Sequence, residues 1–220
     1  MPSKQRTVAV IGLGTFGTSV ALELTRVGDR VLGIDICSKR VSDLADELDA
    51  TLQADTTDTK ALTQCGLESV DAVVIAIGRE MDASVPTALN VLELGLSKIW
   101  VKSQSATHTK VLQAIGISNI IHPERAFGIR LAHTVHNPLV KDFLAIADET
   151  FIVQMAVPHN LINRKLAELK LDAKFSVKCI GLISGSNVTT IDCESTTLLN
   201  GQDMLIAGRR PDLRRFADSL

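Results

Sequence analysis

A glycine-rich turn near the amino terminus constrains the fold of this chain more than any other feature. Residues 12–17 read Gly-Leu-Gly-Thr-Phe-Gly, directly after the apolar run Thr7–Ile11 and at the start of the helix-like run Phe16–Val27. This order predicts a buried strand, a tight glycine turn and a helix. Each glycine meets a different demand: Gly12 allows the turn, Gly14 allows a pyrophosphate to approach the backbone, and Gly17 allows the helix to pack on the sheet.

An acidic residue follows at the position that such a turn requires. Asp35 closes a second apolar run, Val31–Ile34, at roughly the 20-residue offset of a ribose-binding acid. A carboxylate there accepts both ribose hydroxyls and repels a 2′-phosphate, so Asp35 favours an adenosine nucleotide or NAD(H) over NADP. The helix N-terminus offers free N–H groups to phosphate oxygens. The combination predicts nucleotide binding; the alternative interpretation is a tight turn followed by a surface aspartate.

Strand-like and helix-like segments alternate from residue 8 to residue 121. The expected strands are Val8–Ile11, Val31–Ile34, Thr51–Ala54, Ala72–Ile77, Lys98–Val101 and Asn119–Ile121. The expected helices are Phe16–Val27, Val41–Leu48, Thr59–Cys65, Ser84–Leu94 and Thr107–Ala114. Such alternation predicts an α/β fold, a Rossmann-like doubly wound parallel sheet with helices on both faces.

The pattern changes after residue 124. We expect a crossover helix from Arg125 to His136, a short amphipathic segment Leu139–Ala147, and then a small α+β subdomain. Its expected strands are Phe151–Val157, Val177–Ser184, Asn187–Ile191 and Asp203–Ala207, with helical stretches at Asn163–Leu169 and Pro211–Asp218. The predicted domains are residues 1–124, a crossover helix and linker at 125–147, and residues 148–220. Because so small a subdomain buries little surface alone, we expect it to pair with a copy of itself.

Composition excludes several classes of protein. The net charge is −2 and no Lys/Arg-rich block is present, so nucleic acid is not an expected partner. Tyrosine is absent, which excludes the Tyr-x-x-x-Lys pair of short-chain dehydrogenases. The four cysteines have no Cys-x-x-Cys spacing that would indicate a zinc site or a disulfide framework. No export signal or membrane-spanning run is visible, so we expect a cytoplasmic chain that reaches membranes only through a partner.

Seven segments carry a family resemblance that runs in order over nearly the whole chain. They are Val10–Gly17, Val31–Asp35, Val73–Gly78, Ile99–Lys102, Val111–Gly116, Ile120–Arg125 and Asp203–Gly208. In these segments the chain resembles the RCK (KTN) regulatory subunits of Trk and Ktr potassium-uptake systems, most closely the Ktr type. The Ile-Ile-His-Pro-Glu sequence at 120–124 is far more specific than the glycine motif alone.

The resemblance implies a non-enzymatic, nucleotide-sensing gating subunit. Its expected architecture is a Rossmann-like domain, a crossover helix and a C-terminal RCK subdomain, with homodimers assembled into an octameric ring. The ring would dock on an integral-membrane potassium channel or transporter subunit of the KtrB or TrkH type, at the inner face of the plasma membrane. The expected ligands are an adenine nucleotide (ATP or ADP, with NAD(H) as an alternative) and a divalent cation, Mg²⁺ or Ca²⁺.

The resemblance also implies the residues of the site. The expected nucleotide contacts are Gly12, Gly14, Thr15, Phe16, Gly17, Asp35, Ile36, Asp55, Thr56, Ala76, Ile77, Gly78 and Lys102. Lys102 would reach toward the phosphates, and Glu124 would help hold the cation between the phosphates of two facing nucleotides. The alternatives are a surface lysine for Lys102 and, for Glu124, stabilisation of a helix N-terminus by the helix dipole.

Two positions depart from the family pattern. Ktr relatives usually carry an arginine at the position of Thr15, and a lost charge-assisted hydrogen bond weakens binding by roughly 1.5–3 kcal/mol. We therefore expect ADP, NADH or a weakly held ATP as the effector. Some relatives bind cyclic di-AMP through an arginine whose position here is Asp172, and a negative charge there disfavours a phosphate ligand.

Two other functions fit the glycine turn and Asp35. One is an NAD(H)-dependent oxidoreductase, although the second domain is short of paired acid–base residues. The other is a soluble NAD(H)-sensing regulator, which would need a DNA-binding element that the sequence does not display. His133 and His136 lie three apart on the crossover helix and could share a metal, or could be solvated or interface histidines.

Overall fold

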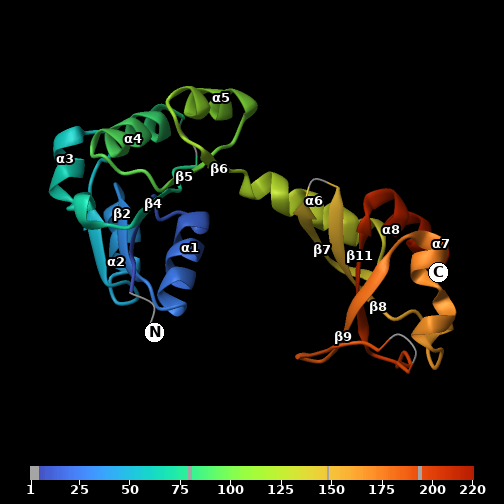
Figure 1. Ribbon diagram of the computed structural model, residues 1–220. Helices are drawn as coiled ribbons and strands as arrows, with labels where there is room; N and C mark the ends of the chain where they lie inside the picture. Colours follow the sequence, from blue (N-terminus) through green and yellow to red (C-terminus); the bar gives the residue numbers. More distant parts are fainter. Residues whose placement is uncertain (1–4, 79–80, 148, 193–194) are drawn as a thin grey trace. The chain divides into compact units, whose positions relative to one another are not determined.

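The computed structural model describes residues 5–78, 81–147, 149–192 and 195–220. It divides into two compact units, Met1–Glu124 and Arg125–Leu220, called here the N-terminal and the C-terminal unit (Figure 1). Within the described residues, no helix combines the length and the apolar character needed to cross a membrane.

The N-terminal unit is built on a six-stranded parallel sheet in the order β3-β2-β1-β4-β5-β6. Its strands are β1 (Thr7–Ile11), β2 (Arg30–Asp35), β3 (Ala50–Gln53), β4 (Ala72–Ile75), β5 (Ile99–Lys102) and β6 (Asn119–Ile121). Its helices are α1 (Thr15–Arg26), α2 (Ser38–Asp43), α3 (Thr59–Gln64), α4 (Met81–Glu93) and α5 (Ala106–Ala114), with a 3₁₀ turn η1 (Leu67–Ser69). The predicted doubly wound α/β fold is confirmed.

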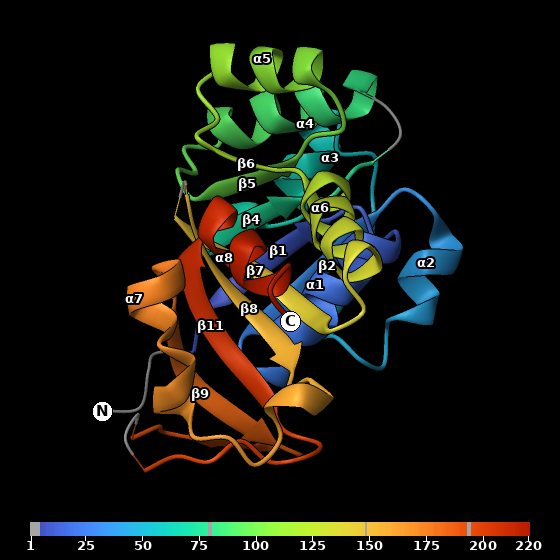
Figure 2. The same cartoon turned by 90° about the vertical axis from the view of Figure 1, so that its right-hand side faces the viewer.

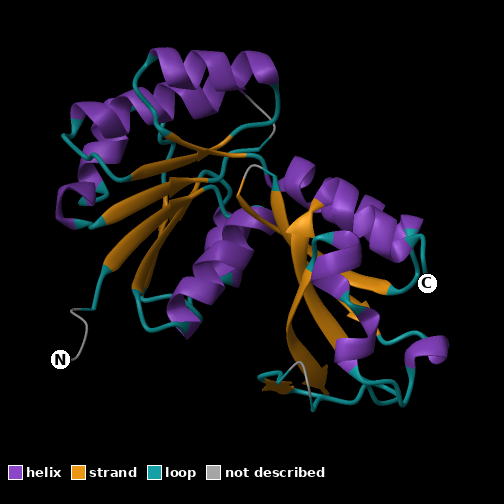
Figure 3. Ribbon diagram, turned by 45° about the vertical axis from the view of Figure 1, so that its right-hand side comes forward, coloured by secondary structure: helices purple, strands orange, loops and turns teal. Residues whose placement is uncertain are grey.

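Helices cover both faces of this sheet because side chains alternate along each strand. On one face, Val10 of β1 packs in a buried cluster with Ala21 of α1 and Leu44 at the end of α2. On the other face, Ile11 packs in a second cluster with Val91 of α4 and with apolar residues of α3 and α5. The two layers of helices on either side of the strands are visible in Figure 3.

The C-terminal unit contains a five-stranded antiparallel sheet in the order β10-β9-β11-β8-β7. Its strands are β7 (Val140–Ala147), β8 (Thr150–Ala156), β9 (Lys178–Ser184), β10 (Asn187–Thr189) and β11 (Asp203–Arg209). Helix α6 (Pro123–His136) begins at the end of the N-terminal unit and continues into this one. The other helices of the C-terminal unit are α7 (Leu171–Phe175) and α8 (Arg210–Ala217), with 3₁₀ turns η2 (His159–Leu161) and η3 (Leu166–Leu169). Leu213 and Phe216 of α8 belong to the same buried cluster as strand residues such as Met155, so α8 lies against the sheet (Figure 2).

Two sequence predictions for this unit are wrong. The segment 139–147, expected as a linker, is almost entirely strand β7, which pairs with β8. Register shifts between Val140 and Asp142 and again near its end disturb the alternation of side chains that would have identified a strand. The expected helix Asn163–Leu169 is a loop followed by η3, because Asn163 has a left-handed φ of 65° that interrupts a helix.

Candidate nucleotide-binding site

The order of the strands defines a crevice at the carboxyl edge of the parallel sheet. Strands β2 and β3 extend from one side of β1, whereas β4, β5 and β6 extend from the other. The loops that follow β1 and β4 therefore leave in opposite directions, and ligands of such sheets bind at this point. The loop after β1 is the glycine turn at 12–17, and the loop after β4 begins with Ala76, Ile77 and Gly78.

The glycine turn is packed so tightly that two of its glycines leave no room for a side chain. Gly12 has a φ of +92°, and a Cβ there would lie 3.0 Å from the backbone of Ala76 and Ile77. A Cβ on Gly17 would lie 1.8 Å from the carbonyl oxygen of Gly12. A Cβ on Gly14, by contrast, would meet nothing within 4 Å. Gly12 and Gly17 thus shape the turn, and the space beside Gly14 is open for a ligand.

The N-terminus of α1 is not capped by a side chain. Gly14 is the N-cap residue and forms no side-chain cap hydrogen bond, and Thr15 is exposed in the first turn. The first N–H groups of a helix have no partner within the helix and carry the positive end of its dipole. The turn therefore presents free donors to an anion, which fits the phosphates of a nucleotide.

Asp35 holds the glycine turn in place. Its side chain is only 3% exposed. Its Oδ2 accepts the Leu13 N–H at 2.7 Å, and its Oδ1 accepts the Cys37 N–H at 2.8 Å. The carboxylate therefore fixes the turn that follows β1 relative to the end of β2.

Arg40 adds a partner to Asp35 that sequence reasoning missed. Its Nη1 donates to Asp35 Oδ2 at 3.3 Å, from a side chain that is 54% exposed. A carboxylate has about four acceptor sites, so the three donors leave one of them for a ribose hydroxyl. Because the Arg40 side chain is exposed, it could move away from Asp35, and a second acceptor site of the carboxylate would then be free. The sequence signal that could have identified Arg40 is its position five residues after Asp35, in the short helix α2.

The remaining predicted residues on the β2–β3 side differ in their surroundings. Ile36 is 63% exposed, directly after β2. Asp55 is exposed, and its pKa is lowered by hydrogen bonds from the hydroxyl and the N–H of Thr57. Thr56 is buried, and its hydroxyl lies 2.8 Å from that of Thr87 in α4. Ile36 and Asp55 are accessible to a ligand, whereas the Thr56 hydroxyl anchors the loop to α4.

Lys102 and Glu124 form an ion pair beside the turn. Lys102 is 7% exposed at the end of β5, and its Nζ lies 2.5 Å from Glu124 Oε1. The same ammonium lies 5.5 Å from the centre of the Phe16 ring. The hydrogen bond from Lys102 lowers the pKa of the Glu124 carboxyl. The structure thus brings Phe16, Lys102 and Glu124 together. The Lys102 ammonium, which is the group expected to bind a phosphate, is paired with the Glu124 carboxylate.

Gly78 provides the space in which Lys102 lies. A Cβ on Gly78 would come within 3.3 Å of Lys102 Nζ and of Gln104 Nε2. Ala76 is buried, and its N–H donates to the Ile11 carbonyl oxygen at 2.7 Å. The loop after β4 therefore borders both the glycine turn and the lysine. Gln104, two residues past β5, is a polar neighbour of the site that the sequence analysis did not identify.

A divalent cation fits here only in company with phosphate. Among the described residues, no group of three or more His, Cys, Asp or Glu side chains could hold a metal ion. Glu124 is a single carboxylate with 64% of its side chain exposed. Mg²⁺ is commonly bound by one or two carboxylates together with phosphate oxygens, and Glu124 could supply one such carboxylate.

Comparison with known proteins assigns the fold and the family. Residues 8–123 match the TrkA-N domain, so the N-terminal unit is a domain of that class. Ktr system potassium uptake protein C of Bacillus subtilis (strain 168) is 34% identical over 94% of this chain and 94% of its own length. Ktr system potassium uptake protein A of the same organism is 31% identical over 97% of this chain and 96% of its own length. The chain therefore belongs to the family of Ktr system potassium uptake proteins A and C.

A solved structure shares the fold. The crystal structure of the GsuK RCK domain superposes with a TM-score of 0.67 at 14% sequence identity. The match covers 97% of this chain and 47% of that one, so this chain spans about half the length of that structure's chain. Both units thus have a counterpart of the same fold, and the resemblance deduced from the sequence is confirmed.

Proposed function

We propose that this chain is the nucleotide-sensing, non-catalytic subunit that regulates a membrane potassium-uptake protein. The observation that carries the proposal is that the uncapped glycine turn, Asp35 and Lys102 all lie at the crevice of the sheet. Membership in the Ktr family supports a role in potassium uptake. The ligand class that suits these groups is an adenine nucleotide, either ATP or ADP, or NAD(H).

The binding mode follows from the contacts of the free site. The N–H groups around Gly14 and Thr15 would bind the phosphates, and Asp35 would accept a ribose hydroxyl. Lys102 would exchange its carboxylate partner, Glu124, for a phosphate oxygen. Released from the lysine, Glu124 could bind Mg²⁺ or Ca²⁺ between itself and the phosphates.

This exchange provides a route from ligand to conformation. Glu124 lies in the first turn of α6, the helix that leads from the N-terminal to the C-terminal unit. A nucleotide that binds one arrangement of α6 more tightly than another shifts the population toward the first. Ligands that differ in phosphate charge would therefore favour different arrangements.

The proposed assembly is a homodimer that builds an octameric ring. The ring would lie at the cytoplasmic face of the plasma membrane, docked on an integral-membrane potassium channel or transporter subunit. Exposed apolar side chains on α6 support an interface between copies, since Phe127 is 61% and Val135 is 74% exposed. Light scattering of the purified protein, with and without nucleotide, tests this assembly; a monodisperse monomer in both would refute it.

Calorimetric titration tests the ligand. ATP, ADP, NAD and NADH would each be titrated into the wild type and into Lys102→Met, with and without Mg²⁺ or Ca²⁺. We expect micromolar binding of at least one nucleotide, weakened roughly 10- to 100-fold by loss of the lysine. Lys110→Met is the matched control, because it removes the same charge from an exposed position on α5.

The outcomes separate the functions. Absence of binding by all four nucleotides, or equal weakening by Lys102→Met and Lys110→Met, would refute the site. Reduction of small carbonyl compounds by NADH in the presence of the protein would instead identify an oxidoreductase. Restoration of potassium uptake in cells that hold only the membrane subunit of a Ktr system would support the regulatory role, and its failure would contradict it.

A further inference from the structure

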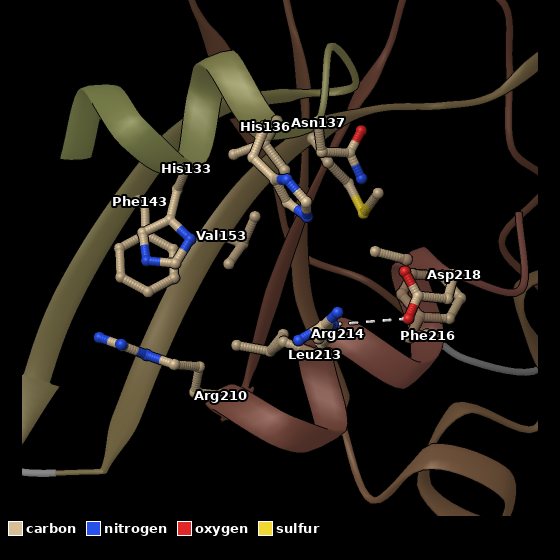
Figure 4. Close-up of a pocket in the computed structure, with 13 residues that line it drawn as sticks. His133, His136, Asn137, Phe143, Val153, Arg210, Leu213, Arg214, Phe216 and Asp218 are labelled. Atoms are coloured by element: carbon tan, nitrogen blue, oxygen red, sulfur yellow. Dashed lines mark ion pairs between the residues drawn. The ribbon is translucent and has the colours of Figure 1, made fainter. Parts of the chain in front are cut away.

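The C-terminal unit contains a cavity that the nucleotide site does not use. It has a volume of about 230 Å³ and lies between the end of α6, strands β7 and β8, and helix α8 (Figure 4). Its apolar lining includes Val140, Phe143, Val153, Met155, Leu213 and Phe216. All six side chains belong to the core of the unit, so the floor of the cavity is firmly packed.

Basic side chains face one another across this floor. His133 and His136 extend from α6, and Arg210 and Arg214 extend from α8 on the opposite side (Figure 4). Asp218 is the one acid among the described residues that line the cavity. With two arginines against one aspartate, the rim carries a net positive charge above an apolar floor.

Arg210 keeps its charge available to a ligand. It forms no ion pair with any carboxylate in residues 5–78, 81–147, 149–192 or 195–220. Its guanidinium lies 5.0 Å from the centre of the Phe151 ring and 5.9 Å from that of Phe143. Such cation–π contacts orient the group without neutralising it. Arg214, by contrast, lies 3.7 Å from Asp218, in a pair that is exposed on both sides and therefore weak.

His133 closes one side of the cavity as a flat surface. Its ring stacks on Phe143, with centroids 3.8 Å apart and an angle of 17° between the planes. Burial lowers the pKa of His133, and the charges of Arg210 and His136 lower it further. The stacked rings of His133 and Phe143 thus form an aromatic wall next to the cationic rim.

We propose that this cavity binds a small amphipathic anion: a carboxylate attached to an aromatic or branched aliphatic body. The carboxylate would pair with Arg210, whose planar fork suits carboxylate oxygens, and the body would fill the apolar floor. The cavity is smaller than the roughly 300–1,000 Å³ of pockets that hold drug-sized ligands, which limits the ligand to a small metabolite.

Occupation of the cavity would act on α6. The ligand would contact residues of α6 and of α8 at once, and so would favour the arrangement in which the last turn of α6 faces α8 across the cavity. The site would thus be a second effector site, separate from the nucleotide site in residues and in ligand chemistry. Its existence does not depend on nucleotide binding.

The test uses 3-phenylpropionate as the probe, titrated calorimetrically into the full chain. Its uncharged amide and acetate are the matched ligand controls, since each lacks one half of the proposed chemistry. We expect saturable binding of 3-phenylpropionate at one site per chain and at least 10-fold weaker binding of both controls. Equal binding of the amide, or no binding of the acid, would overturn the proposal.

Arginine variants locate the site. Arg210→Gln and Arg210→Gln/Arg214→Gln should weaken probe binding about 10-fold or more. Arg215→Gln is the control, because this neighbouring arginine pairs with Asp212 at 2.6 Å and does not line the cavity. Circular dichroism would verify that each variant is folded. Equal weakening by Arg215→Gln would mean that general surface charge attracts the probe, and the proposal would fail.

Discussion

The Asp35→Asn variant separates the two roles that the structure gives to one carboxylate. Asp35 accepts N–H groups from Leu13 and Cys37, and it is also the proposed ribose acceptor. Asparagine has nearly the same shape but only one oxygen. Its amide nitrogen cannot accept, so one of the two N–H groups loses its partner.

The expected loss of stability follows from that count. Leu13 is 3% exposed, and a buried donor left without an acceptor costs about 1–3 kcal/mol. Loss of the ion pair with Arg40 adds little, because the Arg40 side chain is 54% exposed and water can solvate its guanidinium once the carboxylate charge is removed. Since domains are stable by roughly 5–15 kcal/mol, the variant should still fold. Binding of ADP should weaken about 10- to 100-fold through the lost charge-assisted hydrogen bond.

Urea unfolding followed by Trp100 fluorescence measures the first effect. Trp100 is the single tryptophan of the chain and lies on β5, so it reports on the N-terminal unit alone. Asp49→Asn is the matched control: Asp49 also accepts a strand N–H, that of Val31 at 2.9 Å, but at the opposite end of β2. The control should lose stability and keep its affinity for ADP. Unchanged ADP affinity in Asp35→Asn, or the same loss of affinity in Asp49→Asn, would refute the assignment of Asp35 to the ribose.

Two further predictions concern single ionisable groups. Without divalent cations, Glu124→Gln should raise the affinity for ADP several-fold, because Lys102 is freed for phosphate. The same variant should abolish any enhancement of ADP binding by Mg²⁺. Calorimetry with and without a chelator checks both results, and a persistent Mg²⁺ effect would contradict the role of Glu124. The pKa of His133 is lowered in the folded chain, so His133 binds a proton more readily in the unfolded chain. The stability that His133 contributes to the C-terminal unit is therefore fully present above about pH 6.5, and it declines as the pH falls toward the lower pKa of the folded state. His133→Gln should flatten this decline in thermal unfolding monitored between pH 5 and pH 8, and an unchanged profile would show that other groups cause it.

Most of the framework of the site could be predicted from sequence because its signals are local. The turn at 12–17, its flanking strand and helix, and Asp35 at the end of the next strand are encoded by short-range spacing and by steric demands on glycine. The errors arose where a segment depends on distant partners. Strand β7 contains register shifts and is stabilised by its pairing with β8. Its residue pattern alone therefore indicated a linker and not a strand.

The sequence by itself determined the doubly wound class of the N-terminal unit, the glycine turn and the family of the chain. The tertiary structure alone decided which distant charges meet: Lys102 with Glu124, and the arginines of α8 opposite the histidines of α6. The physical reason is range. Backbone geometry and burial patterns act over a few neighbouring residues, whereas side-chain ion pairs depend on distances of a few ångströms between segments that only the folded sheet brings together.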